Sequence, residues 1–434
     1  MKAITFIILW ISILLVYTSF LVAQVDHNQP PINYDSKTPK DRVAGLVQKL
    51  ESGESKLRWD DNFGWLPDIL RKLDIAPSTQ TLVFSRTSQQ HRKIRPSSPR
   101  AIYFNDDSYV GYVRSGDFLE IAAVDPDLGA VFYTLDQKKS DSVLFNRDSI
   151  NCLACHESHK TQGVPGFLVR SVYPKSNGHP DFRFGTTHTD HRTPFSDRFG
   201  GWYVTGNHGK MRHRGNVVVK SDAENAESAI DCDAGANLAE LPKIAMANSY
   251  LKPTSDIVAL MVLEHQTQFH NYVTKANYET RRALHYQSEM NELFERDKEF
   301  QSDTTKRRIQ AVADKLVEYL FFCNEFELTN PIQGHAEFEQ VFRSSSIRDS
   351  KGRSLRDLDL QKRLLKYPCS YLIYSDSFKA LHPAAGKAVK DGVIAVLTGQ
   401  NHSEKFSHLQ DNTRKVILEI LSDTHPWFQN KLRN

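Results

Sequence analysis

Cysteine is scarce in this chain, and the scarcity excludes one class of small extracellular proteins. Only five cysteines occur among 434 residues, far too few for a fold held together by a dense disulfide framework. Cys323 and Cys369 stand in apolar segments, so we expect buried side chains rather than reactive thiols there. Cys232 lies between two aspartates, whose charges raise the pKa of a thiol and make it a poor nucleophile.

An excess of charge of one sign is also lacking. The formal net charge is only +3, with 25% charged and 40% hydrophobic residues. A dedicated nucleic-acid binder usually concentrates basic charge on one face, so we expect no nucleic-acid partner. No internal repeat stands out, and the length allows two or three domains with substantial cores.

One long uncharged run is present, at the N-terminus. Residues 4–23 contain no charged side chain, and Lys2 precedes them. This order is typical of a secretory signal, while a run of this length could also span a bilayer. We therefore expect residues 1–24 to be a signal peptide or an N-terminal membrane anchor, with residues 4–23 as the membrane segment. The body of the protein is then periplasmic or faces the periplasm.

Two periodicities divide the remaining chain and predict an α+β fold. Residues 25–148 form a mixed region, with short helical patterns at 43–50 and 66–73 and antiparallel strands in a meander from about residue 80. Residues 149–220 are loop-rich, with one short helix, and 221–254 are a linker or loop. Residues 255–434 form a mainly helical half, with helical patterns at 257–300, 304–326, 355–365 and 413–421.

The motif Cys152-Leu153-Ala154-Cys155-His156 lies at the start of the loop-rich segment. Two thiols at this spacing can add to the two vinyl groups of one porphyrin, and the following histidine then reaches the iron from one face. This is the attachment signature of c-type haem. The motif predicts one covalent haem c, with Cys152 and Cys155 as thioether residues and His156 as the proximal iron ligand. Export agrees with this prediction, because haem c is attached outside the bacterial inner membrane.

Two other readings of the motif remain open. A zinc knuckle would need a second pair of cysteines or histidines at matching spacing, and the other three cysteines are isolated. A thioredoxin-like redox motif would sit between a strand and a helix in a βαβ unit, whereas the strands upstream predict a meander.

The segment CLACHESHKTQGVPGFL resembles the haem segment of bacterial cytochromes c over roughly residues 150–168. In that family a prolyl carbonyl accepts the ring N–H of the proximal histidine, and the resemblance implies that Pro165 has this role. Such a bond fixes the ring and raises its basicity. Residues 184–216 and 366–375 also resemble a family of large, uncharacterised bacterial proteins with a single haem motif, which implies no particular activity.

The sixth iron ligand is not specified by any motif. Met211 follows His156 at a distance compatible with a small cytochrome c, but its neighbours are strongly basic. His188 and His191 could contribute to a second metal site, although no third ligand is evident. Each side chain also has an ordinary alternative, as a surface histidine or a core methionine. The distal candidates are His208, Met211, His213, Met261 and His265.

These observations support two classes of function. The first is electron transfer through one haem to a redox partner protein. The second is a haem-dependent oxidoreductase with an open distal site for peroxide or another small-molecule oxidant, which the many histidines and arginines around the motif favour. A third reading is a haem subunit of a membrane-associated complex. A di-haem peroxidase is disfavoured because the chain carries one attachment motif. Electron transfer is our leading expectation, and whether the chain is an enzyme is left open.

Overall fold

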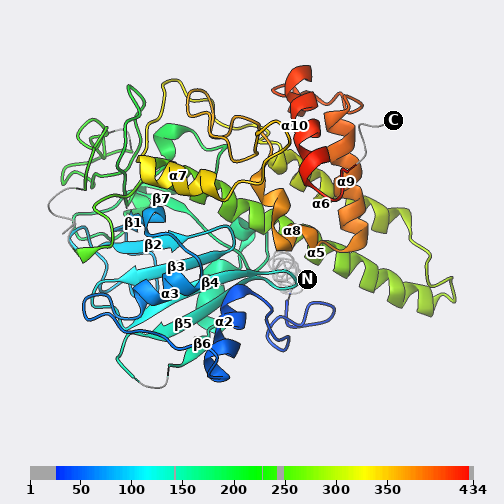
Figure 1. The fold of residues 1–434 in the computed structure, drawn as a ribbon, viewed down its shortest axis with the longest axis horizontal. Helices are drawn as coiled ribbons and strands as arrows, with labels where there is room; N and C mark the ends of the chain where they lie inside the picture. Colours follow the sequence, from blue (N-terminus) through cyan, green and yellow to red (C-terminus); the bar gives the residue numbers. More distant parts are fainter. Residues whose placement is uncertain (1–25, 141–142, 227, 242–248, 430–434) are drawn as a thin grey trace, which may run out of the picture.

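The fold is α+β, as the sequence predicts, with an antiparallel sheet in the N-terminal half and helices in the C-terminal half (Figure 1). The computed structural model describes residues 26–140, 143–226, 228–241 and 249–429. The expected signal or anchor at residues 1–24 lies outside the described residues. Within the described residues, no helix is both long enough and apolar enough to cross a membrane.

A seven-stranded sheet forms the centre of the N-terminal half, with strand order β6-β5-β4-β3-β2-β1-β9. Every neighbouring pair is antiparallel. The expected meander is thus confirmed for five strands, and β6 and β9 extend it at its two edges. The strands are β1 (Thr81–Val83), β2 (Arg100–Phe104), β3 (Ser108–Val113), β4 (Phe118–Asp125), β5 (Gly129–Asp136), β6 (Phe145–Arg147) and β9 (Trp202–Tyr203). A separate ribbon pairs β7 (Arg170–Val172) with β8 (Thr186–His188).

Alternate side chains of the sheet enter two different cores. One face packs with α2 (Arg42–Glu51) and α3 (Leu66–Lys72), whose apolar residues share a cluster with Tyr103 and Val131. The other face, which includes Phe104 and Phe132, shares its cluster with the C-terminal helices. Because successive residues of a strand point to opposite sides, this pattern explains why the strands are apolar on both faces. The two halves of the chain therefore share a core.

Helix α5 (Ile257–Leu293) is the longest described helix, and it contacts both β5 and the other C-terminal helices (Figure 1). Its first turn is capped by Asp256, whose carboxylate accepts from the backbone N–H of Ala259 at 2.8 Å. It ends at Leu293, before the expected end at residue 300, because Glu295, two residues further on, has a positive φ of 51° that a helix cannot continue through. The other C-terminal helices are α6 (Asp303–Leu320), α7 (Ala336–Ser344), α8 (Asp376–Lys379), α9 (Pro383–Leu397) and α10 (Asp411–Thr424).

One predicted helix is wrong. Residues 355–365 form an irregular segment without a helix, in which Leu360 has a φ of 58° and its N–H donates to the carbonyl of Arg363. Several leucines of this segment are nevertheless buried. Their helix-like spacing in the sequence therefore comes from packing of a tight turn against the core, without a helix. Residues 221–226, 228–241 and 250–254 contain no helix or strand, in agreement with the expected loop.

Candidate haem attachment site

The attachment motif lies on a short helix, α4 (Ile150–His156), which follows the edge strand β6. The carboxylate of Asp148 accepts from the backbone N–H of Asn151 at 3.0 Å and so caps the first turn. Arg147 donates to the carbonyls of Tyr34 at 2.7 Å and Lys37 at 3.0 Å. The start of α4 is therefore tied to the edge of the sheet and to the N-terminal segment.

The short helix expected at the motif is confirmed as α4. It brings the side chains of the two cysteines and the histidine of the motif to one face. Cys152, Cys155 and His156 occupy positions i, i+3 and i+4, which are neighbours on a helix surface. Cys152 is half-buried and Cys155 is exposed. The Gln89 side-chain amide lies 3.6 Å from the Cys152 sulfur, and burial raises the pKa of this thiol to about 12. Neither cysteine forms a disulfide bond.

The ring of His156 is oriented by a backbone carbonyl. Its Nδ1 lies 2.9 Å from the carbonyl oxygen of Gly166. A carbonyl only accepts, so Nδ1 carries the proton and Nε2 keeps the lone pair that a metal needs. Burial lowers the pKa of His156 below its ordinary value, which keeps the ring neutral near pH 7. The bond therefore fixes the ring and leaves Nε2 as the nitrogen with a lone pair.

The acceptor is one residue beyond the proline that the cytochrome c resemblance implies. The carbonyl of Pro165 instead accepts from the backbone N–H of Ala130 at 3.3 Å, at the start of β5. Gly166 turns both of its backbone groups toward α4, because its N–H also donates to the carbonyl of His156 at 2.9 Å. Pro165 thus anchors the segment to the sheet, and Gly166 takes the expected role.

Helix α5 fixes the position of Gly166. The fully buried Asn271 accepts from the backbone N–H of Phe167 and donates to the carbonyl of the same residue, both at 2.8 Å. A Cβ atom on Gly166 would lie 2.3 Å from the Asn271 Oδ1. Glycine is therefore required here by a close approach of side chain to backbone. Asn271 and Gly166 are parts of the site that the sequence motif does not reveal.

The face of α4 looks onto one end of the sheet. The rings of His156 and Phe132 have centroids 4.7 Å apart. Arg100 and Glu120 form an ion pair on this face, and the Gln90 amide donates to Glu120 at 3.3 Å. After burial, the charges of these two residues are the further influences on the pKa of His156, Arg100 lowering it and Glu120 raising it. A charged pair therefore lies beside the proximal ring.

Three buried nitrogen atoms around α4 have no hydrogen-bond partner among the described residues: Arg100 Nε, Arg170 Nε and His188 Nε2. Arg170 and His188 face each other in the β7–β8 ribbon, and the charge of Cys155 acts on Arg170. Buried polar atoms in folded proteins are normally hydrogen-bonded. Haem combines a flat apolar body with two carboxylates, so aromatic side chains next to side-chain nitrogens that still have a hydrogen bond to give suit it. The residues present fit the group that the motif implies.

Three of the five distal candidates form one buried aromatic cluster. The rings of His208 and His213 lie 4.6 Å apart, with Phe195 and Phe199 around them, and Met211 is buried in the same segment. Both ring nitrogens of His208 are engaged, by the carbonyl of Met211 at 2.8 Å and the backbone N–H of Asn237 at 3.1 Å. His208 therefore has no free lone pair in this arrangement.

His265 lies in a second buried cluster. Its Nδ1 is 2.9 Å from the Nδ1 of His191, and its Nε2 is 2.8 Å from the Ser370 hydroxyl. Both nitrogens are thus engaged here as well. His213, Met211 and Met261 are buried, and their role as distal ligands stays a prediction. Within the described part of the chain, no hydrogen bond or ring contact joins any of the five candidates to His156.

The described ranges contain no set of side chains that could bind a second metal at His188 and His191. No group of three or more His, Cys, Asp or Glu side chains comes together there, and His188 and His191 enter different surroundings. No protein-family model matches the chain, and neither a curated protein nor a solved structure does. The functional argument therefore rests on the residues of this site.

Sequence reasoning missed several members of the site. Arg100, Glu120 and Asn271 come from segments far from the motif, and only the packing of the sheet and α5 brings them to it. The signal for Gly166 was present, because a glycine follows Pro165 directly in the segment that resembles cytochromes c. The resemblance placed the acceptor by analogy, whereas the hydrogen bond depends on how this chain turns.

Proposed function

We propose that the chain is an exported c-type haem protein that transfers electrons through one haem attached to Cys152 and Cys155. The observation that carries the proposal is the bond between His156 Nδ1 and the Gly166 carbonyl, which leaves Nε2 as the metal-binding nitrogen on the same helix face as both thiols. Bound haem would supply a one-electron couple.

The residues of the chain would hold this group and set its surroundings. His156 would bind the iron, and the Gly166 carbonyl would hold its ring and raise its basicity. Phe132 would cover the ring from the sheet side. Arg100, largely buried and ion-paired with Glu120, would border the ring, and that carboxylate would offset its positive charge. The electron would pass to a redox partner protein or a small-molecule oxidant.

Attachment is tested by expressing the chain in a host with a haem c maturation system. We expect a mass increment of one haem per chain and retention of the haem after acid–acetone extraction. Cys152→Ala combined with Cys155→Ala should abolish covalent attachment, whereas Cys232→Ala, a half-buried cysteine outside the motif, should retain it. A mature protein without the increment would refute the proposal. Fractionation of the same cells tests the periplasmic location.

A second candidate function is a haem-dependent oxidoreductase or sensor with an open distal position. The observation that favours it is the engagement of both ring nitrogens in His208 and in His265, together with the charged pair beside His156. Polar side chains around an open haem position assist small-molecule binding and O–O chemistry.

Optical and EPR spectra of the ferric protein separate the two functions. Electron transfer predicts low-spin iron that, once reduced, binds carbon monoxide slowly or not at all. An open site predicts high-spin iron that binds carbon monoxide at once. Either spectrum retains the haem proposal and decides the activity.

A further inference from the structure

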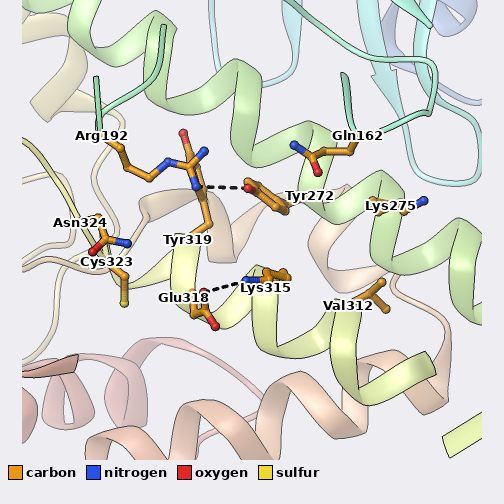
Figure 2. Close-up of a pocket in the computed structure, with 10 residues that line it drawn as sticks. All are labelled: Gln162, Arg192, Tyr272, Lys275, Val312, Lys315, Glu318, Tyr319, Cys323 and Asn324. Carbon is orange, nitrogen blue, oxygen red and sulfur yellow. Dashed lines mark hydrogen bonds and ion pairs between the residues drawn. The ribbon is translucent and has the colours of Figure 1, made fainter. Parts of the chain in front are cut away.

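A cavity of about 290 Å³ lies between helices α5 and α6 and is bordered by the loop that follows the attachment motif (Figure 2). Tyr272 and Lys275 come from α5, while Lys315 and Tyr319 come from α6. Gln162 closes one side from the loop after the motif. The volume is just below the roughly 300–1,000 Å³ of typical ligand sites, so an occupant must be small.

The cavity is lined by more positive than negative charge. Arg192, Lys275 and Lys315 stand against one acid, Glu318. Glu318 is already bound by two lysines, Lys315 at 3.4 Å and Lys405 at 2.6 Å. Lys275 has no ion-pair partner among the residues that the structure describes. A negative charge that entered the cavity would therefore meet Lys275, a cation without an ion-pair partner there, beside Arg192 and Lys315, which are paired with Asp190 and Glu318.

Arg192 is held ready to donate. Its Nε and Nη2 bind the carboxylate of Asp190, with the shortest contact at 2.5 Å, and its Nη1 donates to the Tyr272 hydroxyl at 3.2 Å. Its guanidinium also lies over the ring of Tyr319, 5.1 Å from the centroid. These bonds use three of its five N–H groups, and a fixed guanidinium with remaining donors suits a carboxylate.

The rest of the lining is apolar or aromatic. Tyr272 and Tyr319 have ring centroids 4.8 Å apart, and Val312 lies on the α6 side. Figure 2 shows the ring of Tyr272 between Arg192 and Lys275, with Lys315 on the opposite wall. Flat rings of this kind favour a flat apolar body. We propose that this cavity binds a small organic carboxylate with a flat body, with Lys275, Lys315 and Arg192 as its cationic partners.

The proposal is independent of the haem and is tested by calorimetric titration of the purified full chain with benzoate. We expect saturable binding of benzoate, with the neutral isostere benzamide at least about tenfold weaker because it offers no charge. Inorganic phosphate is the third probe. Binding of phosphate as tight as benzoate would refute the flat organic body, and equal binding of benzamide would refute the role of charge.

Two variants locate the binding in this cavity. Lys275→Gln and Lys315→Gln should each weaken benzoate binding about three- to fivefold, because each removes one partly exposed charge. The matched control is Lys306→Gln, an exposed lysine on α6 that does not line the cavity, and it should leave the affinity unchanged. The absence of saturable benzoate binding, or equal affinities in all three variants, would overturn the proposal. Thermal unfolding of each variant checks that it is folded.

Discussion

The contact between Asn271 and Gly166 allows a prediction that couples the stability of the fold to the proposed haem site. Asn271 satisfies both backbone groups of Phe167 and is fully buried. In Asn271→Ala these two groups lose their partners, and each buried unpaired group costs about 1–3 kcal/mol. We therefore expect the free energy of unfolding, measured by urea unfolding, to fall by about 2–6 kcal/mol.

Gly166→Ala damages the same contact from the other side. Its Cβ would stand 2.3 Å from Asn271 Oδ1 and 3.0 Å from the Cβ of Thr161, and overpacking of this kind costs about 1–3 kcal/mol. In the double variant the shortened side chain at position 271 removes the clash. Its loss of unfolding free energy should therefore be smaller than the sum of the two single losses by about 1 kcal/mol or more. The cycle thus measures the coupling directly.

Strict additivity of the two losses, within about 0.5 kcal/mol, would contradict the contact. The reduction potential of the haem-loaded protein provides a second readout, because the Gly166 carbonyl holds the ring of His156. Both single variants should shift the reduction potential of the haem-loaded protein. As a control, Gly163→Ala replaces a neighbouring glycine with no atom within 4 Å of its Cβ position. It should leave the potential unchanged, although its φ of 67° makes some loss of stability expected.

Three further predictions concern single side chains. Burial raises the pKa of Glu264 to about 7, although Arg198 lies beside it. In the unfolded chain this carboxyl loses its proton near pH 4.5. Between about pH 4.5 and 7 the folded chain therefore binds more protons than the unfolded chain. The stability that this group contributes falls as the pH rises through that range. Urea unfolding at pH 5 and pH 7.5 should therefore show a smaller loss on raising the pH in Glu264→Gln than in the parent, and equal pH dependence would contradict the assignment. Arg100→Gln leaves the largely buried Glu120 without its ion-pair partner and should cost about 1–3 kcal/mol, whereas the exposed Arg92→Gln should be neutral; equal losses would argue against the pair. His208→Ala should leave the spin state of the haem unchanged, because both ring nitrogens are engaged elsewhere, and a change from low-spin to high-spin iron would identify His208 as the distal ligand.

The sheet could be predicted from the sequence because its signal is local. Short β-branched and aromatic runs separated by turn residues place five strands in order, and antiparallel neighbours need only short connections. The aromatic run at residues 201–204 predicts a strand, and β9 confirms it. Its pairing with β1 could not be predicted, since Trp202 and Tyr203 reach β1 across a long sequence separation. Helix α9 was also missed, although Pro383 stands at its start, where proline is well accommodated.

The site shows the same division between local and distant information. The motif places two thiols and an imidazole on one helix face, which follows from helical spacing alone. The carbonyl that holds the imidazole belongs to Gly166, only 10 residues after His156. Its position also depends on Asn271, which bonds the next residue, Phe167, from 104 residues further along the chain. The distal candidates were chosen by residue type, whereas hydrogen bonds to the backbone and to other histidines decide which nitrogens stay free.

Helix α5 connects the segment around the attachment motif with the charged cavity. Asn271 holds the segment that carries the proximal acceptor, and its neighbour Tyr272 lines the charged cavity with Lys275 one turn on. Gln162, in the loop between His156 and Gly166, borders the same cavity. An anion that drew these cations together would act on a helix and a loop that both position His156. Addition of benzoate to the haem-loaded protein should therefore shift its reduction potential in the parent and less in Lys275→Gln. An unchanged potential under saturating benzoate would show that α5 supports the two sites without linking them.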